Sequence, residues 1–145
     1  KFNLISPQDG YLYLLNEGPT AGGLVSLNLL YPTPANSNLN AAVAANQTIQ
    51  TGNNQFDQHV GEEKFWIVWS AQPVAEIETV KAAAVQAAQA TGLPEIKDSN
   101  QRTAILAFLN QYLSESEAKS DEAKEQTIVT SSSETLVTFI RLKHL

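Results

Sequence analysis

The sequence predicts an α+β domain: a mostly antiparallel, β-sandwich-like fold with a two-helix insertion before the C-terminal strands. Three observations carry this prediction. Apolar residues alternate in short runs along 1–72, recur at helical spacing along 73–113, and return among β-branched residues along 127–145. Because strands flank the helices, the helices should pack on the sheet. The 145 residues should therefore form a single domain.

The N-terminal strands are short and are separated by turn residues. "LVSLNLLY" alternates Val25, Leu27 and Leu29 with more polar positions, which is typical of a strand with one buried face. Further strands are expected in "KFNLIS" and "YLYLL", at 1–6 and 11–15, and a weak short strand in "QTIQT", at 47–51. Turn signatures such as Pro7 to Gly10 divide them. The first 72 residues should therefore supply most of the sheet.

The strongest strand is "KFWIVWS", 64–70. Phe65, Ile67 and Trp69 should point to one face, and Trp66 and Val68 to the other. Because both faces are apolar, both should be covered, so this strand should be central. The two tryptophans could instead line a ligand face, but core packing explains them more simply.

The segment from Tyr31 to Asn46 should be a long surface loop. Pro32 and Pro34 cannot donate to a sheet ladder, so strand pairing should stop there. The asparagines that follow offer hydrogen-bonding groups, and long loops often carry binding residues. The alternative is that they cap their own turns. The candidate binding residues are Tyr31, Asn36, Asn38 and Asn40.

The region 73–113 should contain two helices. Pro73 suits the start of the first helix, Gly92 its end, and Asp98 with Gln101 resembles a capping box for the second. The helices should pack through Ile77, Val80, Ile105, Phe108, Leu109 and Tyr112. The alanine-rich first helix could also be an oligomerisation surface, although packing on its own sheet is the simpler interpretation. The charge-rich segment 114–126 is expected to be a linker or helix tail, followed by closing strands at 127–145.

Composition argues against several classes of function. The formal net charge is −6 without a basic patch, which disfavours nucleic-acid binding. The absence of cysteine excludes disulfides, thiolate catalysis and zinc–cysteine sites. We expect no transmembrane segment. The chain begins at Lys1 and lacks methionine, so we expect it to be a fragment of a longer protein.

Several motifs together resemble the bacterial DUF4384 family, a domain of unknown function. They are Gly10-Tyr11, the strand end at Leu30 to Pro32, the Asn36–Asn40 loop, Gly61 with Glu63, and Ser70 to Pro73. The final "IRLKHL" also resembles the closing strand of such domains. The resemblance implies an accessory domain in larger bacterial signalling or cell-envelope proteins. It implies no catalytic residues.

The main polar constellation is "FDQHVGEE", which contains Asp57, His59, Glu62 and Glu63. These residues could bind a divalent metal or form the site of an enzyme of unrecognised type. A polar turn before the central strand explains them more simply, because a metal site needs several ligands in fixed geometry. Glu62 and Glu63 are neighbours on a strand, so they should point to opposite faces and cannot flank one bond.

The sequence therefore favours a non-catalytic accessory or binding module of a larger bacterial cell-envelope or signalling protein. Its partner is expected to be a protein or a cell-surface polymer, without a cofactor or metal. The expected location is the bacterial cell envelope or periplasm, with the cytoplasm as the alternative. The alternative function is an enzyme with a polar site at the Asp57–Glu63 turn. The oligomeric state is left open.

Overall fold

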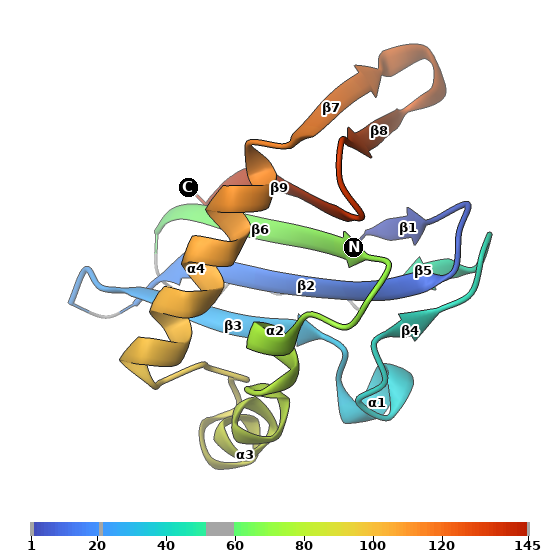
Figure 1. Ribbon diagram of the computed structural model, residues 1–145. Helices are drawn as coiled ribbons and strands as arrows, with labels where there is room; N and C mark the ends of the chain where they lie inside the picture. Colours follow the sequence, from blue (N-terminus) through green and yellow to red (C-terminus); the bar gives the residue numbers. More distant parts are fainter. Residues whose placement is uncertain (1, 21, 52–59, 145) are drawn as a thin grey trace.

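The protein is built on a five-stranded antiparallel sheet (Figure 1). The computed structural model describes residues 2–20, 22–51 and 60–144. Strands β3, β2, β6 and β9 lie side by side in that order, and β4 pairs with β2 along the same edge as β3. The bounds are β2 Gly10–Pro19, β3 Val25–Tyr31, β4 Ala42–Val43, β6 Gly61–Ser70 and β9 Thr135–His144.

The predicted central strand is confirmed as β6. It pairs with β2 on one side and with β9 on the other. Phe65 and Trp66, which point to opposite faces, are both buried, and Ile67 and Trp69 are half-buried. Apolar side chains on both faces can be removed from water only where both faces are covered, which is why this strand lies inside the sheet.

Helices cover one face of the sheet (Figure 1). Helix α2 spans Ala75–Glu78 and continues with a bend into α3, Lys81–Thr91, and α4 spans Ser99–Leu113. Gly92, at φ +80°, ends α3, and the Asp98 carboxylate accepts a hydrogen bond of 2.8 Å from the backbone N–H of Gln101. The predicted pair of helices, with the break between Gly92 and Asp98, is confirmed. No helix in the described residues is long and apolar enough to cross a membrane.

The helices bury the predicted residues against the sheet. Ile77, Val80, Ile105 and Leu109 are almost completely buried, and they share one cluster with Trp66 of the central strand. Phe108 and Tyr112 are half-buried at the margin, with their ring centroids 4.8 Å apart. The helical insertion is therefore part of the main core.

A small second layer covers part of the other face. Strands β1, Asn3–Ile5, and β5, Thr48–Gln50, form a two-stranded antiparallel sheet. Phe2 and Leu4 pack on a second apolar cluster that includes Phe65, and the Phe2 and Phe65 ring centroids lie 5.5 Å apart. The sandwich-like α+β architecture follows, with helices on one face of the sheet and a short second sheet on the other.

The expectation of a linker or helix tail at 114–126 is wrong. The chain instead forms a hairpin of β7, Ser116–Asp121, and β8, Gln126–Ser131, joined by a 3₁₀ turn at Glu122–Lys124. The hairpin projects away from the main sheet (Figure 1). Residues 116–121 have a helix-forming composition, but the β-branched residues of β8 supply a partner strand, and pairing overrides local propensity. Of the two expected closing strands, only β9 joins the main sheet.

Candidate functional site

The segment after β3 is more ordered than the long loop that the sequence predicts. It contains the short helix α1, Pro34–Ser37, and strand β4. Tyr31, expected to be a binding residue, is only 4% exposed and belongs to the second apolar cluster. The pairing of β2 with β3 shifts between Leu14 and Leu15, a β-bulge that places Tyr31 opposite Leu14. Tyr31 is therefore a core residue, which corrects the prediction.

The asparagines of this segment have different roles. The side-chain oxygen of Asn40 accepts a hydrogen bond of 3.0 Å from the backbone N–H of Ala42, so Asn40 caps its own turn. Asn38 is exposed and adopts a left-handed backbone conformation with φ +50°. Asn36 lies in α1, and its side chain is outside the described part of the structure. For Asn40, the structure favours the turn-capping alternative over ligand binding.

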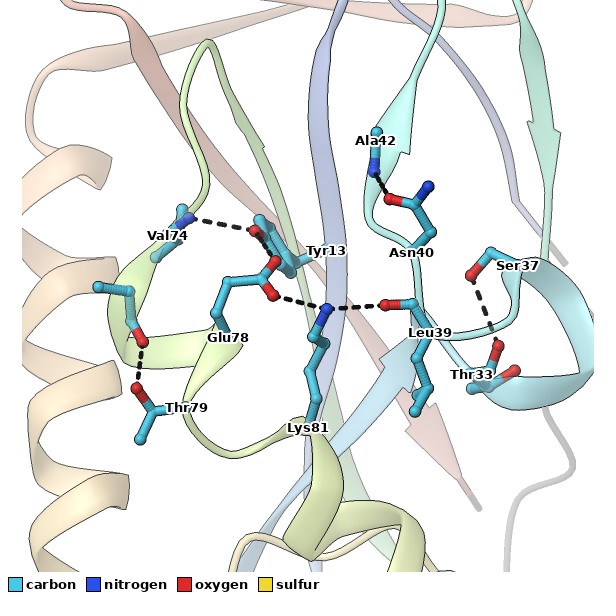
Figure 2. Close-up of polar contacts among 11 residues, drawn as sticks. Tyr13, Thr33, Ser37, Leu39, Asn40, Ala42, Val74, Glu78, Thr79 and Lys81 are labelled. Atoms are coloured by element: carbon cyan, nitrogen blue, oxygen red, sulfur yellow. Dashed lines mark hydrogen bonds and ion pairs between the residues drawn. The ribbon is translucent and has the colours of Figure 1, made fainter.

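A chain of polar contacts fastens this segment to the helices (Figure 2). The Lys81 ammonium donates a hydrogen bond of 2.7 Å to the carbonyl of Leu39 and forms an ion pair of 2.5 Å with Glu78. The other carboxylate oxygen of Glu78 accepts a hydrogen bond of 2.6 Å from the Tyr13 hydroxyl. That hydroxyl accepts a bond of 3.1 Å from the backbone N–H of Val74. Strand β2, the bent helix and the loop are thus held together.

The Tyr13 hydroxyl acts in this network as a neutral donor. Burial, and then the hydrogen bond to the Glu78 carboxylate, raise the pKa of Tyr13 well above its ordinary range. The backbone N–H of Val74 acts in the opposite direction but is outweighed. A phenol with a raised pKa is a weak acid and keeps its proton, so the hydroxyl serves here as a hydrogen-bond donor that positions Glu78.

Beside the chain of polar contacts that joins the loop to the helices lies an apolar groove of about 380 Å³. One wall comes from the end of β3 and the start of the loop, and the other comes from α3 and the segment after it. Because the side chains of α3 at this point are mostly small, they leave room between the helix and the proline-rich loop. The lining residues are Leu29, Pro32, Thr33, Pro34, Ala84, Val85, Ala88, Gln89 and Pro94. None of these side chains is ionisable near neutral pH.

A second concavity of about 440 Å³ lies where α2 and α4 meet the ends of β6 and β9. Of the described residues that line it, Glu76 is the single carboxylate, with the Tyr112 phenol as a neighbouring polar group. The described lining residues therefore do not contain the pair of carboxylates that most glycoside hydrolases use.

The polar turn before β6 falls largely outside the described residues, since Asp57 and His59 belong to the undescribed segment 52–59. Glu62 is exposed and forms an ion pair of 3.4 Å with Arg141. Glu63 is buried on the opposite face and accepts a hydrogen bond of 2.5 Å from the Asn16 amide. These two carboxylates diverge as predicted. Within the described residues, no group of three or more His, Cys, Asp or Glu side chains could hold a metal ion.

Sequence reasoning located one wall of the groove and missed the other. The sequence predicts a binding role for the proline-containing loop, whereas for the alanine-rich helix that carries Val85 and Ala88 it predicts only packing on the sheet or oligomerisation. Of the residues in α3, only Ala84 is buried, so one apolar side chain after another stays near the surface. The sequence feature that could have indicated this second wall is the alanine-rich helix itself, because a helix of small side chains buries little apolar surface in the core.

Comparison of the chain with family models, with curated proteins and with solved structures gave no match.

Proposed function

We propose that this domain is a non-catalytic binding module that holds an apolar segment of a partner protein in the groove between α3 and the loop after β3. The observation that carries the proposal is the groove itself. It is lined by prolines, small aliphatic side chains and neutral polar groups, without an ionisable side chain among the described lining residues. Such a lining can bury an apolar side chain but offers no acid or base for chemistry.

The lining also defines the chemistry of the partner. A charged group would lose its hydration in this groove without gaining an opposite charge, so the bound segment should be neutral and apolar. The volume of about 380 Å³ is near the lower end of the range of about 300–1,000 Å³ that ligand pockets occupy. A few apolar side chains of one segment would fill it.

The anchored loop favours binding because one wall of the groove is already in place. The Lys81 contact to Leu39 and the turn formed by Asn40 limit the freedom of the loop before any partner arrives. A wall that is ordered in advance reduces the conformational entropy lost on binding. This supports a protein-binding role for the segment 31–46, with its prolines as contact residues in place of Tyr31.

A protein partner is favoured over a cell-surface polymer. Sugar-binding sites use exposed aromatic faces, and the two tryptophans are committed to packing. Trp66 is 1% exposed, and Trp69 packs in the second apolar cluster beside Gly10. We include in the proposal that the module belongs to a larger bacterial protein of the cell envelope or of a signalling system. The resemblance to the DUF4384 family supports that placement.

The test uses peptides selected from a phage-displayed random library on the full-length protein. We expect the selected peptides to be rich in neutral apolar residues. Ala88→Arg, which places a charge in the groove, should weaken their binding at least about tenfold. Ala90→Arg is the matched control, because Ala90 is an exposed residue of the same helix outside the groove. Circular dichroism checks that both variants fold.

Equal binding by the two arginine variants would place the site elsewhere. Selection of charged peptides would contradict the apolar chemistry of the groove.

A further inference from the structure

The two edges of the main sheet differ in how they are covered. Along β3, the backbone N–H of Leu29 donates to the carbonyl of Pro94 at 2.9 Å, and the N–H of Ile96 donates to the carbonyl of Leu27 at 2.8 Å. The segment before α4 therefore closes the middle of this edge with two main-chain hydrogen bonds. The opposite edge is β9, a strand of ten residues.

The hairpin covers β9 only at its start. The backbone N–H of Val137 donates to the Ser116 hydroxyl at 3.0 Å, and the carbonyl of Thr135 accepts from the Ser131 and Ser133 hydroxyls. These contacts show that residues 135 and 137 direct their backbone groups away from β6. Because this direction repeats every second residue in an antiparallel strand, Phe139, Arg141 and Lys143 also direct theirs outward. Among the described residues, those three have no backbone partner on that side.

The side chains beside this free edge have a definite pattern. On the helix side of the sheet lie Phe139, Arg141 and Lys143, and the Arg141 side chain is 56% exposed. On the opposite side, Ile140 and Leu142 are 37% and 36% exposed. The edge strand thus presents two cations on one side and two apolar side chains on the other, in a chain whose net charge is −6. Glu62 compensates the positive charge of Arg141 only in part, because their ion pair of 3.4 Å is exposed to solvent.

From this pattern we propose a second binding surface, separate from the groove. The free edge of β9 binds an extended partner segment in which acidic and apolar residues alternate, and this segment adds to the sheet as an antiparallel strand. Exposed edges bind partners in this way through main-chain hydrogen bonds, while alternate side chains give specificity. The acidic residues lie beside Arg141 and Lys143, and the apolar residues lie beside Ile140 and Leu142.

A second copy of the chain fits this edge poorly. If β9 pairs with itself in antiparallel registers clear of the hairpin, Arg141 faces either Arg141 or Lys143 of the other copy. Like charges directly opposite each other destabilise strand pairing. The register that sets Phe139 opposite Arg141 also brings Lys143 opposite Val137, where Ser116 already occupies the edge. An acidic segment avoids both problems.

Antiparallel addition also decides which peptide amides face β9. Residues directly opposite each other share a face of the sheet, and the outward-directed residues of β9 carry the cations. The acidic residues of the added strand therefore direct their N–H groups to β9, and its apolar residues direct theirs to solvent.

The test titrates the full-length protein with the synthetic peptide TVEVEVT and follows backbone amide resonances by NMR. The amides of Phe139, Arg141 and Lys143 should shift most. N-methylation of the two glutamates should abolish binding, whereas N-methylation of the valines should leave it within about twofold, because only the first change removes donors that face β9. The peptide TVKVKVT should bind at least about tenfold more weakly.

On the protein, Arg141→Glu should weaken TVEVEVT binding at least about tenfold and strengthen that of TVKVKVT. Lys97→Glu is the matched control, an exposed cation beside the closed edge, and should leave both unchanged. Ala88→Arg should also leave TVEVEVT binding unchanged, so failure at the edge and failure at the groove are distinguishable. Indifference to charge reversal, indifference to N-methylation, or sedimentation as a dimer that Arg141→Glu dissociates would each overturn the proposal.

Discussion

The ammonium group of Lys81 lies 2.7 Å from the carbonyl oxygen of Leu39 and joins parts of the chain 42 residues apart. The same ammonium contacts Glu78, which is held by Tyr13 of the central sheet. This contact therefore links the loop after β3 to the start of α3, and side chains of both elements line the apolar groove.

Removal of the Lys81 ammonium should loosen the loop. Lys81→Met keeps most of the aliphatic stem but leaves the Leu39 carbonyl and the Glu78 carboxylate without their shared donor. We expect a loss of about 1–3 kcal/mol in unfolding free energy, the typical range for a hydrogen bond to a charged group. Amide hydrogen exchange near Asn40 should become faster. Lys97→Met, at an exposed cation, is the control and should change neither quantity.

The helical insertion should contribute strongly to stability. Leu109 is completely buried in the main cluster, so Leu109→Ala should lower the unfolding free energy by about 2–5 kcal/mol in urea denaturation. Phe108→Ala should lower the unfolding free energy by less than the same substitution at a fully buried phenylalanine, because Phe108 is half-buried. Leu93→Ala is the control, since Leu93 is 49% exposed. A Leu109→Ala protein as stable as the Leu93→Ala protein would mean that α4 is peripheral.

The Tyr13 phenol should make stability fall at alkaline pH. Its pKa is raised in the folded state, so the folded protein retains a proton that the unfolded chain releases above about pH 10. The contribution of Tyr13 is therefore fully present below about pH 10 and is lost as the pH rises further. In Tyr13→Phe, unfolding free energy measured between about pH 8 and about pH 11 should decline less steeply than in the wild type. An unchanged slope would show that Tyr13 does not titrate differently in the two states.

Position 10 should require glycine because the Trp69 ring leaves no room for a Cβ atom, and not because of a turn. A Cβ atom at Gly10 would lie 2.6 Å from the indole atoms, and Gly10 is not among the glycines with positive φ. Gly10→Ala should therefore cost about 1–3 kcal/mol through overpacking. In a Trp69→Val background the same substitution should cost much less, because the ring is gone. Equal costs in the two backgrounds would point to a backbone requirement at Gly10.

Local signals in the sequence determined much of the fold. The apolar residues on both faces of Phe65 to Trp69 could be buried only in a covered central strand, and β6 is that strand. Gly92 and Asp98 marked the break between the helices, because a left-handed end and a side-chain cap are properties of a few adjacent residues. The divergence of Glu62 and Glu63 followed from the period of a strand alone.

The tertiary structure decided the features that depend on residues far apart in the chain. Tyr31 is buried because a bulge against β2 turns it toward Leu14, and no pattern within β3 encodes that partner. The groove lies where the loop after β3 meets α3, and within the described residues the hairpin contacts the backbone of β9 only at its first residues. Strand pairing and helix docking set these relationships through long-range contacts, which local periodicity does not contain.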